Sequence, residues 1–585
     1  MCGIIGYIGK NCEKVLLTGL KRLEYRGYDS AGMTVSRDGE FVTYKEVGEV
    51  KNLEKIVSLS EDFGYGIAHT RWATHGSISL ENTHPHFSAN GSVALVHNGI
   101  IENFEELKND LLAKSIRFYG QTDSEVVAKM FDKLNINSLR YVLKRLVGSY
   151  ALVLLSKEGE QLYFAKNRSP LYVARGEDCV MIASDPSCFV DFADSYFELE
   201  DGDYGKISLK NDVFYNKNDE KIEKMPKKID FNFLSEDKSG YEHYMIKEIY
   251  QSRLVLESLI ERYQTTNLKA KLEEIKHLEF DRIYLVGCGT AYHAGLVGQS
   301  YLNERFNIDT FCDIASELPN KNYNIDSHSL CIFISQSGET ADTISALKFC
   351  KERDAHIVAL TNVEYSTIAH LADINLPIFA GQEKSVASTK AYFAQCVTLY
   401  ILSCFLQGKD YVEPLKIFKN HIDFGDDNEL KKLAKVVARY DKVFFIGRGK
   451  DYITSQEASL KLKEITYIFS TAVASGELKH GSLSLVDDKF LTVVISSDKE
   501  QFAKTLSNAY EIKSRGGKLL LITSLFIDSD VRGNFDYVLE VPKTENDLLP
   551  MQIILPLQKL AYFTACERGN NPDKPRNLAK SVTVE

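Results

Sequence analysis

The chain of 585 residues has one tryptophan, twelve prolines and no apolar run near the roughly 20 residues that a membrane-spanning helix needs. Its N-terminal apolar stretch is only a few residues long and has no basic leader, so we expect neither a membrane anchor nor a signal peptide. The formal net charge is −11. Because an acidic protein repels phosphate backbones, we expect no nucleic-acid partner.

Cysteine pairs at metal-binding or redox spacing are also lacking. The eleven cysteines are scattered without a C-x-x-C pair, which argues against a disulfide framework or a structural zinc site. We therefore predict a reduced, cytoplasmic protein without a metal or cofactor. Five histidines raise the alternative of a zinc site, but no two of them have the i, i+4 spacing of a helical zinc pair. They are His69, His75, His84, His86 and His97.

The length exceeds that of one ordinary core, so several domains are expected. Residues 1–210 contain short apolar runs punctuated by Gly, Asn and Asp, a pattern that predicts a strand-rich region. The charged stretch 211–239 predicts an edge hairpin followed by a linker.

The second half contains an internal repeat, in which four apolar segments recur in the same order. Such a repeat indicates two copies of one α/β unit. Continuous apolar strands that alternate with helices predict a parallel sheet covered on both faces, and ligands of such sheets bind at the carboxyl ends of the strands. The paired segments are 281–289 with 441–449, 315–318 with 475–478, 330–335 with 491–496, and 356–361 with 518–523.

Cys2 becomes the first residue if Met1 is removed. Its α-amine, with a pKa of about 8, would then lie beside its own thiol and could act as the base of a nucleophile. The alternative is an ordinary buried cysteine in a first strand. The context favours the nucleophile, because four further blocks follow in order. The five blocks are residues 2–6, 24–32, 69–76, 97–103 and 121–125.

Together these blocks resemble the glutaminase domain of the N-terminal-nucleophile amidotransferases. The resemblance implies an α+β fold with stacked antiparallel sheets between helices. It also implies that a cysteine attacks the glutamine amide while an oxyanion hole holds the developing charge. By this resemblance, catalysis falls to Cys2, Asn98 (side chain) and Gly99 (backbone N–H), and glutamine binding to Arg71, Trp72, Thr74, His75 and Asp123.

Three of these residues have a distinct implied role. Arg71 suits the α-carboxylate of glutamine, because a guanidinium can bind both of its oxygens. Asp123 suits the α-ammonium, and Trp72 resembles the family's gate between the glutamine site and the ammonia passage.

The turn 335–340 joins a predicted strand to a predicted helix and offers hydroxyls, an amide and backbone N–H groups. Such a turn can hold a phosphate at a helix N-terminus, although an ordinary capped helix has similar residues. In the second copy the turn is 496–501, which lacks the glycine and has an added carboxylate. The first copy is therefore the predicted phosphate site.

The two units resemble tandem sugar isomerase (SIS) domains with parallel sheets. With the glutaminase half, nearly the whole chain resembles the glucosamine-6-phosphate synthase family, whose members are glutamine–fructose-6-phosphate aminotransferases that isomerise their product. The specific blocks are 335–340, 386–390, 461–464, 476–481 and 575–585. The predicted organisation is a glutaminase domain at 2–215, a linker at 216–240, SIS domains at 241–420 and 421–575, and an active-site tail at 576–585.

The same resemblance implies roles for residues of the isomerase half. Glu464 would move a proton between C1 and C2, His480 would assist ring opening, and Lys580 would form a Schiff base with Lys461 alongside. Ala291 stands where we associate a serine with some family members, which puts one sugar contact in doubt. Sugar-phosphate binding is assigned to Thr290, Ser335, Gln336, Ser337, Thr340, Val386 and Ser388.

The implied partners are L-glutamine and D-fructose 6-phosphate, with a homodimer as the expected assembly. Two other synthases begin with the same glutaminase. Asparagine synthetase would need an ATP-binding glycine-rich loop, which is not found, and phosphoribosyl-pyrophosphate amidotransferase lacks tandem isomerase units. A phosphosugar sensor that merely binds is the non-enzymatic alternative, and a retained nucleophile argues against it.

Overall fold

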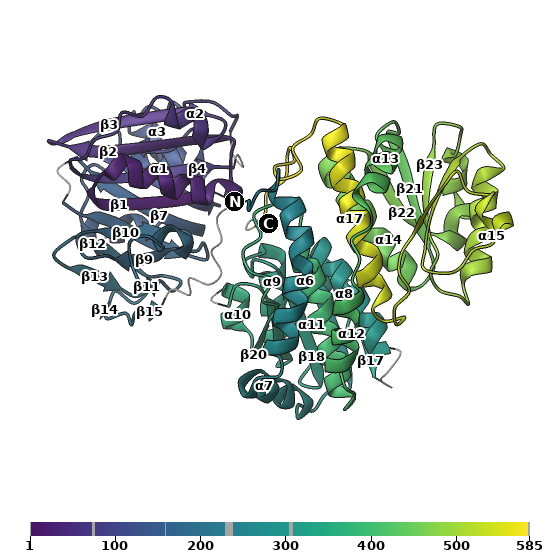
Figure 1. Cartoon of the computed structure of the whole chain (residues 1–585). Coiled ribbons are helices and arrows are strands. Elements are labelled where there is room, and N and C mark those ends of the chain that lie inside the picture. Colours follow the sequence, from purple (N-terminus) through teal and green to yellow (C-terminus); the bar gives the residue numbers. More distant parts are fainter. Residues whose placement is uncertain are drawn as a thin grey trace. The chain divides into compact units, whose positions relative to one another are not determined.

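The computed structural model describes residues 2–72, 76–157, 160–228, 238–303, 308–364 and 366–582. The chain divides into two compact units, the first formed mainly by residues up to 234 and the second by residues 235–580. Figure 1 shows both units.

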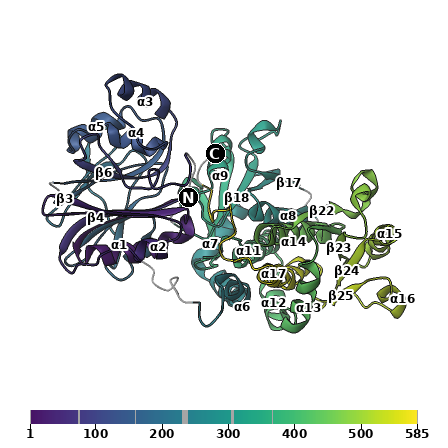
Figure 2. The ribbon, with the colours of Figure 1, turned by 90° about the horizontal axis from the view of Figure 1, so that it is seen from above.

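Two antiparallel sheets are stacked in the first unit, and helices cover both outer faces (Figure 2). The eight-stranded sheet has the order β15-β11-β9-β10-β1-β4-β2-β3 and the seven-stranded sheet the order β14-β13-β12-β8-β7-β6-β5. The first sheet contains β1 (Gly3–Lys10), β2 (Ser30–Arg37), β3 (Glu40–Val47), β4 (Phe63–Arg71), β9 (Tyr172–Arg175), β10 (Val180–Ala183), β11 (Ser195–Glu198) and β15 (Lys227–Lys228). The second contains β5 (His86–Phe87), β6 (Val93–Ile101), β7 (Gly148–Ser156), β8 (Leu162–Asn167), β12 (Tyr204–Ile207), β13 (Asp212–Tyr215) and β14 (Lys221–Ile222).

Strand β7 shows why this layering follows from the sequence. Its side chains alternate between the two faces of the sheet, as the pleat requires. Ala151 and Val153 enter the core between the sheets, whereas Leu152 and Leu154 enter the core beneath the helices. The continuous apolar run is therefore explained by burial on both faces. The helices of this unit are α1 (Cys12–Leu23), α2 (Val50–Glu54), α3 (Phe104–Ala113), α4 (Asp123–Lys129) and α5 (Ile136–Leu143).

The second unit has two five-stranded parallel sheets with the orders β17-β16-β18-β19-β20 and β22-β21-β23-β24-β25. In each copy the second strand lies at one edge, next to the first. The direction of strand order reverses between the first and third strands, where open parallel sheets bind ligands. The strands are β16 (Arg282–Gly287), β17 (Asp309–Ile314), β18 (Ser329–Ser335), β19 (His356–Thr361), β20 (Ile374–Pro377), β21 (Lys442–Gly447), β22 (Phe469–Ala474), β23 (Leu491–Ile495), β24 (Lys518–Thr523) and β25 (Tyr537–Glu540).

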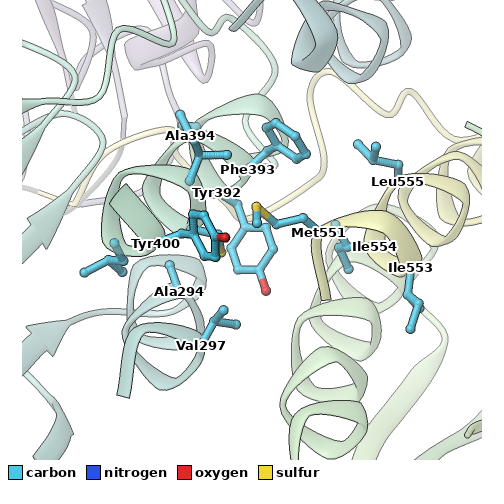
Figure 3. Packing of buried hydrophobic residues seen from close by; sticks show 14 of the residues in the cluster. Ala294, Val297, Tyr392, Phe393, Ala394, Tyr400, Met551, Ile553, Ile554 and Leu555 are labelled. Atoms are coloured by element: carbon cyan, nitrogen blue, oxygen red, sulfur yellow. The ribbon is translucent and has the colours of Figure 1, made fainter. Parts of the chain in front are cut away.

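Long helices from both copies share one hydrophobic core in the second unit. Helix α11 is buried at almost every position because α8 and α6 pack against it, which suits its apolar surface all round. Figure 3 shows part of this core, where side chains of α8, α11 and α17 gather. The helices are α6 (Tyr244–Arg262), α7 (Thr266–Lys276), α8 (Thr290–Asn303), α9 (Ala341–Lys351), α10 (Thr367–Leu371), α11 (Lys390–Leu406), α12 (Val412–His421), α13 (Asp427–Val437), α14 (Lys450–Thr466), α15 (Phe502–Lys513), α16 (Ser529–Arg532) and α17 (Leu549–Glu567).

The predicted fold class is confirmed, since antiparallel sheets form the first unit and parallel sheets the second. The segment 216–240, expected to be a linker, contributes the short edge strands β14 and β15 to the first unit. Within the described ranges, no helix is both long enough and apolar enough to cross a membrane.

Candidate active sites

The first site forms where β1 begins and β4 ends. Gly3 pairs with Thr70 in the antiparallel ladder, so Cys2 lies beside the end of β4. The backbone N–H of Trp72 donates a hydrogen bond to Cys2 Sγ at 3.2 Å. Burial raises the pKa of the Cys2 thiol, while the N-terminal positive charge, this N–H group and Arg71 lower it. Removal of the thiol proton therefore needs a nearby base.

Asn98 on β6 contacts Cys2. Its Nδ2 donates to the Cys2 carbonyl oxygen at 2.9 Å, which leaves Oδ1 as an acceptor. His69 Nε2 lies 3.1 Å from that Oδ1 and 3.0 Å from the carbonyl oxygen of His97. Since both neighbours are acceptors, Nε2 carries the proton. Burial lowers the pKa of His69 to about 3, so its ring is neutral and fixes the orientation of the Asn98 amide.

Gly99 follows in β6 with a φ of 125°, in the region that favours glycine. A Cβ at this position would lie 2.1 Å from the carbonyl oxygen of Ser149 on the neighbouring strand. No larger residue fits without moving the sheet. The geometry is compatible with a backbone N–H that serves the oxyanion hole beside Asn98.

The two residues predicted to bind the charged groups of glutamine, Arg71 and Asp123, are buried in the same unit. Arg71, the last residue of β4, donates to the carbonyl oxygens of Ser77 at 3.2 Å and Gly76 at 3.4 Å. Asp123, the first residue of α4, accepts from the N–H of Ile101 at 2.9 Å. Thr74 and His75 lie outside the described residues.

Three histidine rings of the cluster, those of His69, His84 and His86, pack against one another. The rings of His69 and His84 stack with centroids 3.9 Å apart, and His84 meets His86 edge to face at 4.5 Å. Burial lowers the pKa of His84 and of His86 well below the usual value, so both rings are neutral. In the described part of the chain, no group of three or more His, Cys, Asp or Glu side chains is placed to hold a metal ion.

The second site begins at the turn after β18. Ser335 Oγ accepts the N–H of Gly338 at 3.0 Å and lies 3.3 Å from Thr340 Oγ1. Ser337 Oγ accepts the N–H of Glu339 at 3.2 Å. Among the described residues, no group accepts a hydrogen bond from the backbone N–H of Gln336 or Ser337. Two donors at this turn are therefore available to an anion.

Helix α14 of the second copy brings Lys461 and Glu464 together as an ion pair at 2.6 Å. Lys461 also donates to Thr290 Oγ1 at 3.0 Å, and that hydroxyl donates to Glu457 Oε1 at 3.1 Å. His293 Nδ1 lies 2.7 Å from the other Glu457 oxygen. Burial lowers the pKa of Lys461, but Glu464 and Glu457 outweigh it and raise the pKa above its usual value. Lys461 is thus held as a cation.

Lys580 of the tail forms a buried ion pair with Glu383. Burial would raise the pKa of Glu383, yet the ammonium of Lys580 lowers it to about 2. The same carboxylate accepts from Ser388 Oγ at 2.9 Å and from the N–H of Thr389 at 2.9 Å. The predicted Schiff-base lysine therefore lies beside a predicted sugar contact, and a rigidly held carboxylate connects them.

Two further predicted residues, Val386 and His480, lie outside the contacts described so far. The N–H of Val386 donates to the carbonyl oxygen of Asp573 at 3.0 Å, so Val386 lies beside the segment that precedes the tail. His480 ends a short 3-10 helix and is exposed. Among the described residues it makes no hydrogen bond or ion pair with Glu464, Lys461 or Lys580.

Comparison with known proteins covers both units. The model of the glutamine amidotransferase domain matches residues 69–191, and that of the SIS domain matches residues 279–403 and 437–566. Over 609 aligned residues the chain is 40% identical to the glutamine–fructose-6-phosphate aminotransferase (isomerizing) of Fusobacterium nucleatum, with 100% of both chains covered. This chain belongs to the family of isomerizing glutamine–fructose-6-phosphate aminotransferases.

Other members of the aminotransferase family agree. The protein of that name from Pyrococcus horikoshii is 40% identical over 609 residues, again with 100% of both chains covered. Among solved structures, the C-terminal domain of glucosamine-fructose-6-phosphate aminotransferase from Francisella tularensis is 34% identical with a TM-score of 0.53. It covers 58% of this chain and 100% of its own length.

Several residues of these aminotransferase sites were missed by sequence analysis. Glu457 precedes Lys461 by four positions and Glu464 by seven, a spacing that places all three on one face of a helix. That signal was available in the sequence. His69 was weighed only as a metal ligand, and nothing near Glu383 in the sequence indicates its contact with a lysine almost 200 residues away.

Proposed function

We propose that the chain transfers the amide nitrogen of L-glutamine to D-fructose 6-phosphate and isomerises the product to D-glucosamine 6-phosphate. The observation that carries this proposal is that two differently equipped sites occur in one chain. Cys2 meets an oriented Asn98 amide in the first unit. In the second, the Lys461–Glu464 pair is joined through Thr290 to the copy that holds the anion-binding turn.

In the first unit, Cys2 would attack the side-chain carbonyl carbon of glutamine. Its own α-amine would take the thiol proton once Met1 is removed. The negative oxygen of the tetrahedral intermediate would accept hydrogen bonds from Asn98 and from the N–H of Gly99, and one such donor is worth roughly a hundred- to a thousand-fold in rate. Ammonia leaves, and water then releases L-glutamate from the thioester.

In the second unit, the phosphate would bind at residues 335–340 and Lys580 would attack the C2 ketone with loss of water. An amine attacks a ketone only in its neutral form, so the Lys580 ammonium that pairs with Glu383 has to lose a proton first. Ammonia would then add to C2 and release the Lys580 amine, which leaves the sugar as an imine. Glu464 would move a proton from C1 to C2 of this imine, and the Lys461 cation would stabilise negative charge that develops beside it. By family resemblance, His480 would assist opening of the sugar ring.

The test is to mix the protein with glutamine and fructose 6-phosphate and identify the product by mass. Cys2→Ala should abolish glutamine-driven synthesis and leave fructose 6-phosphate binding intact, as measured by calorimetry. Cys179→Ala, at another half-buried cysteine of the same unit, is the matched control and should keep full activity. Synthesis that persists in Cys2→Ala would identify a different nucleophile and overturn the assignment.

We also propose that the chain acts as a cytoplasmic homodimer, as the family resemblance implies. Sedimentation velocity on the purified full chain gives the mass of the assembly. Fractionation of cells that produce the protein gives its location.

A further inference from the structure

Both SIS domains have a turn at the switch point of their sheets. Ser335 ends β18, and its counterpart Ser496 follows β23. The N–H of Glu500 is bonded to Asp498 Oδ1 at 2.8 Å, just as the N–H of Glu339 is bonded to Ser337 Oγ at 3.2 Å. The two turns differ at Gly338, which has a φ of 68° and whose N–H is bonded to Ser335 Oγ, but the N–H groups just before it have counterparts in the second turn.

In the second domain these donors already have an acceptor. Asp451 Oδ2 accepts the N–H of Ser497 at 2.8 Å and that of Asp498 at 3.2 Å. The equivalent N–H groups of the first domain belong to Gln336 and Ser337, which have no acceptor among the described residues. The Asp451 side chain therefore makes the difference: it occupies the N–H groups of the second turn, whereas those of the first turn are available to a ligand.

The counterpart of Asp451 in the first domain is Ala291. Each of the two residues follows a glycine-containing loop and lies in the first turn of its helix. The N–H of each donates to the carbonyl oxygen of the residue three positions earlier, at 3.1 Å in both domains. A Cβ on Gly287 would touch the backbone of Ala291, and a Cβ on Gly447 that of Asp451. The backbones are therefore equivalent, and the methyl group of Ala291 cannot fill the turn as a carboxylate does.

We propose that Asp451 is an internal anion that occupies, in the second SIS domain, the turn equivalent to the phosphate-binding turn of the first, and so confines phosphosugar binding to the first domain. This inference rests on the proposed function, because it takes the first turn as the phosphate site. Asp451 is buried and its carboxylate accepts two backbone N–H groups, the arrangement that an anion adopts at a helix N-terminus. The first turn stays open because Ala291 has no carboxylate at the position of Asp451.

The experiment removes the internal anion and counts bound phosphate by equilibrium dialysis with labelled inorganic phosphate. Asp498→Ser, which restores the residue type of Ser337, is the matched background because Asp451 remains in place. We expect one phosphate per chain for the unaltered protein and for Asp498→Ser, and two for Asp498→Ser with Asp451→Ala. Asp451→Asn in the same background keeps an acceptor over the turn and should stay at one.

A folded double variant that binds one phosphate, or a second phosphate in Asp498→Ser alone, would overturn the inference. If the double variant does not fold, Ala291→Asp is the reciprocal test. It should supply the first turn with a carboxylate and lower phosphate binding from one per chain to none, and binding that persists also contradicts the inference. Failure of the proposed site is distinguishable, because Ser337→Ala would then leave fructose 6-phosphate binding unchanged.

Discussion

The two SIS domains share a fold but not a chemistry. Gly289 and Gly449 have the same φ of 54°, and both sheets have the same strand order. The first domain offers hydroxyls and open N–H groups at its turn, whereas the second offers an acid–base pair on α14. The comparison shows that a duplicated domain keeps its fold, whereas a few side chains determine the function of each copy.

Helices α8 and α14 show how the copies diverged. Val297 and Tyr301 of α8 are fully buried in the shared core, and Val297 is seen there in Figure 3. Their counterparts on α14 are Glu457 and Lys461, which are equally buried but charged. Burial of such charges is tolerated because each is paired. The first domain used these positions for packing, and the second used them for a polar network.

The largest difference should follow from Glu464→Gln. General acid–base catalysis contributes roughly 10²–10⁴-fold, so formation of glucosamine 6-phosphate should fall by about that factor. Fructose 6-phosphate binding should persist, because the phosphate site belongs to the other domain. Activity assays and calorimetry measure the two effects separately. Lys463→Gln, at the exposed neighbouring position, is the control, and equal losses in both variants would remove Glu464 from the mechanism.

Glu457→Gln tests the network that joins the domains. It leaves Lys461 and His293 without their shared carboxylate, and breaking a buried ion pair typically costs about 3–5 kcal/mol. We expect a loss of this size in the free energy of unfolding, measured with urea. Glu511→Gln breaks the more exposed pair with Lys479 and should cost about 1 kcal/mol at most. Similar losses at both sites would mean that Glu457 contributes only a surface-like charge.

Ser337→Ala and Thr340→Val should each weaken fructose 6-phosphate binding. Each removes a hydrogen bond to a charged group worth roughly 1.5–3 kcal/mol, which is about 10- to 150-fold in Kd. Ser497→Ala, the counterpart of Gln336, should change little, because its hydroxyl accepts the N–H of Ser524 and faces no phosphate in this account. Calorimetry compares the three variants, and equal losses at both turns would show that the phosphate site is misassigned.

The smallest expected effect is a pH dependence of stability at Asp451. Burial raises its pKa to about 6, and the nearby Asp498 adds to the rise. Because the folded pKa exceeds the unfolded value, this group stabilises the fold at low pH and loses that contribution as the pH rises through 6. Relative to Asp451→Asn, the unaltered protein should lose about 1 kcal/mol of unfolding free energy between roughly pH 5 and pH 7.5.

Urea unfolding of both proteins at matched pH values measures this difference. The substitution cancels the titration of all other groups, so only Asp451 remains in the comparison. If the difference in unfolding free energy between the unaltered protein and Asp451→Asn does not change with pH, Asp451 titrates normally and is more hydrated than its burial indicates.

Local pattern was enough to predict the larger elements. The apolar run of β7 and the repeated strands of the second half are long and regular, so the sheets and their doubling could be inferred. Candidate site residues such as Cys2 were named from the sequence because they lie in compact motifs. Glu383 and Glu248 were not, since their partners lie far away in the sequence. Burial and the carboxylate of Glu383 raise the pKa of Glu248 to about 8, a property that no short motif encodes.

The sequence by itself determined the fold of both units, the duplication and the residue types at each turn, because these depend on periodicity and local chemistry. Only the tertiary structure decided which donors are free. Asp451 and Ser497 are 46 positions apart, and nothing in either segment indicates that one satisfies the other. Whether an N–H group can bind a phosphate depends on whether the folded chain has already given it an acceptor, and that is a matter of distances in space.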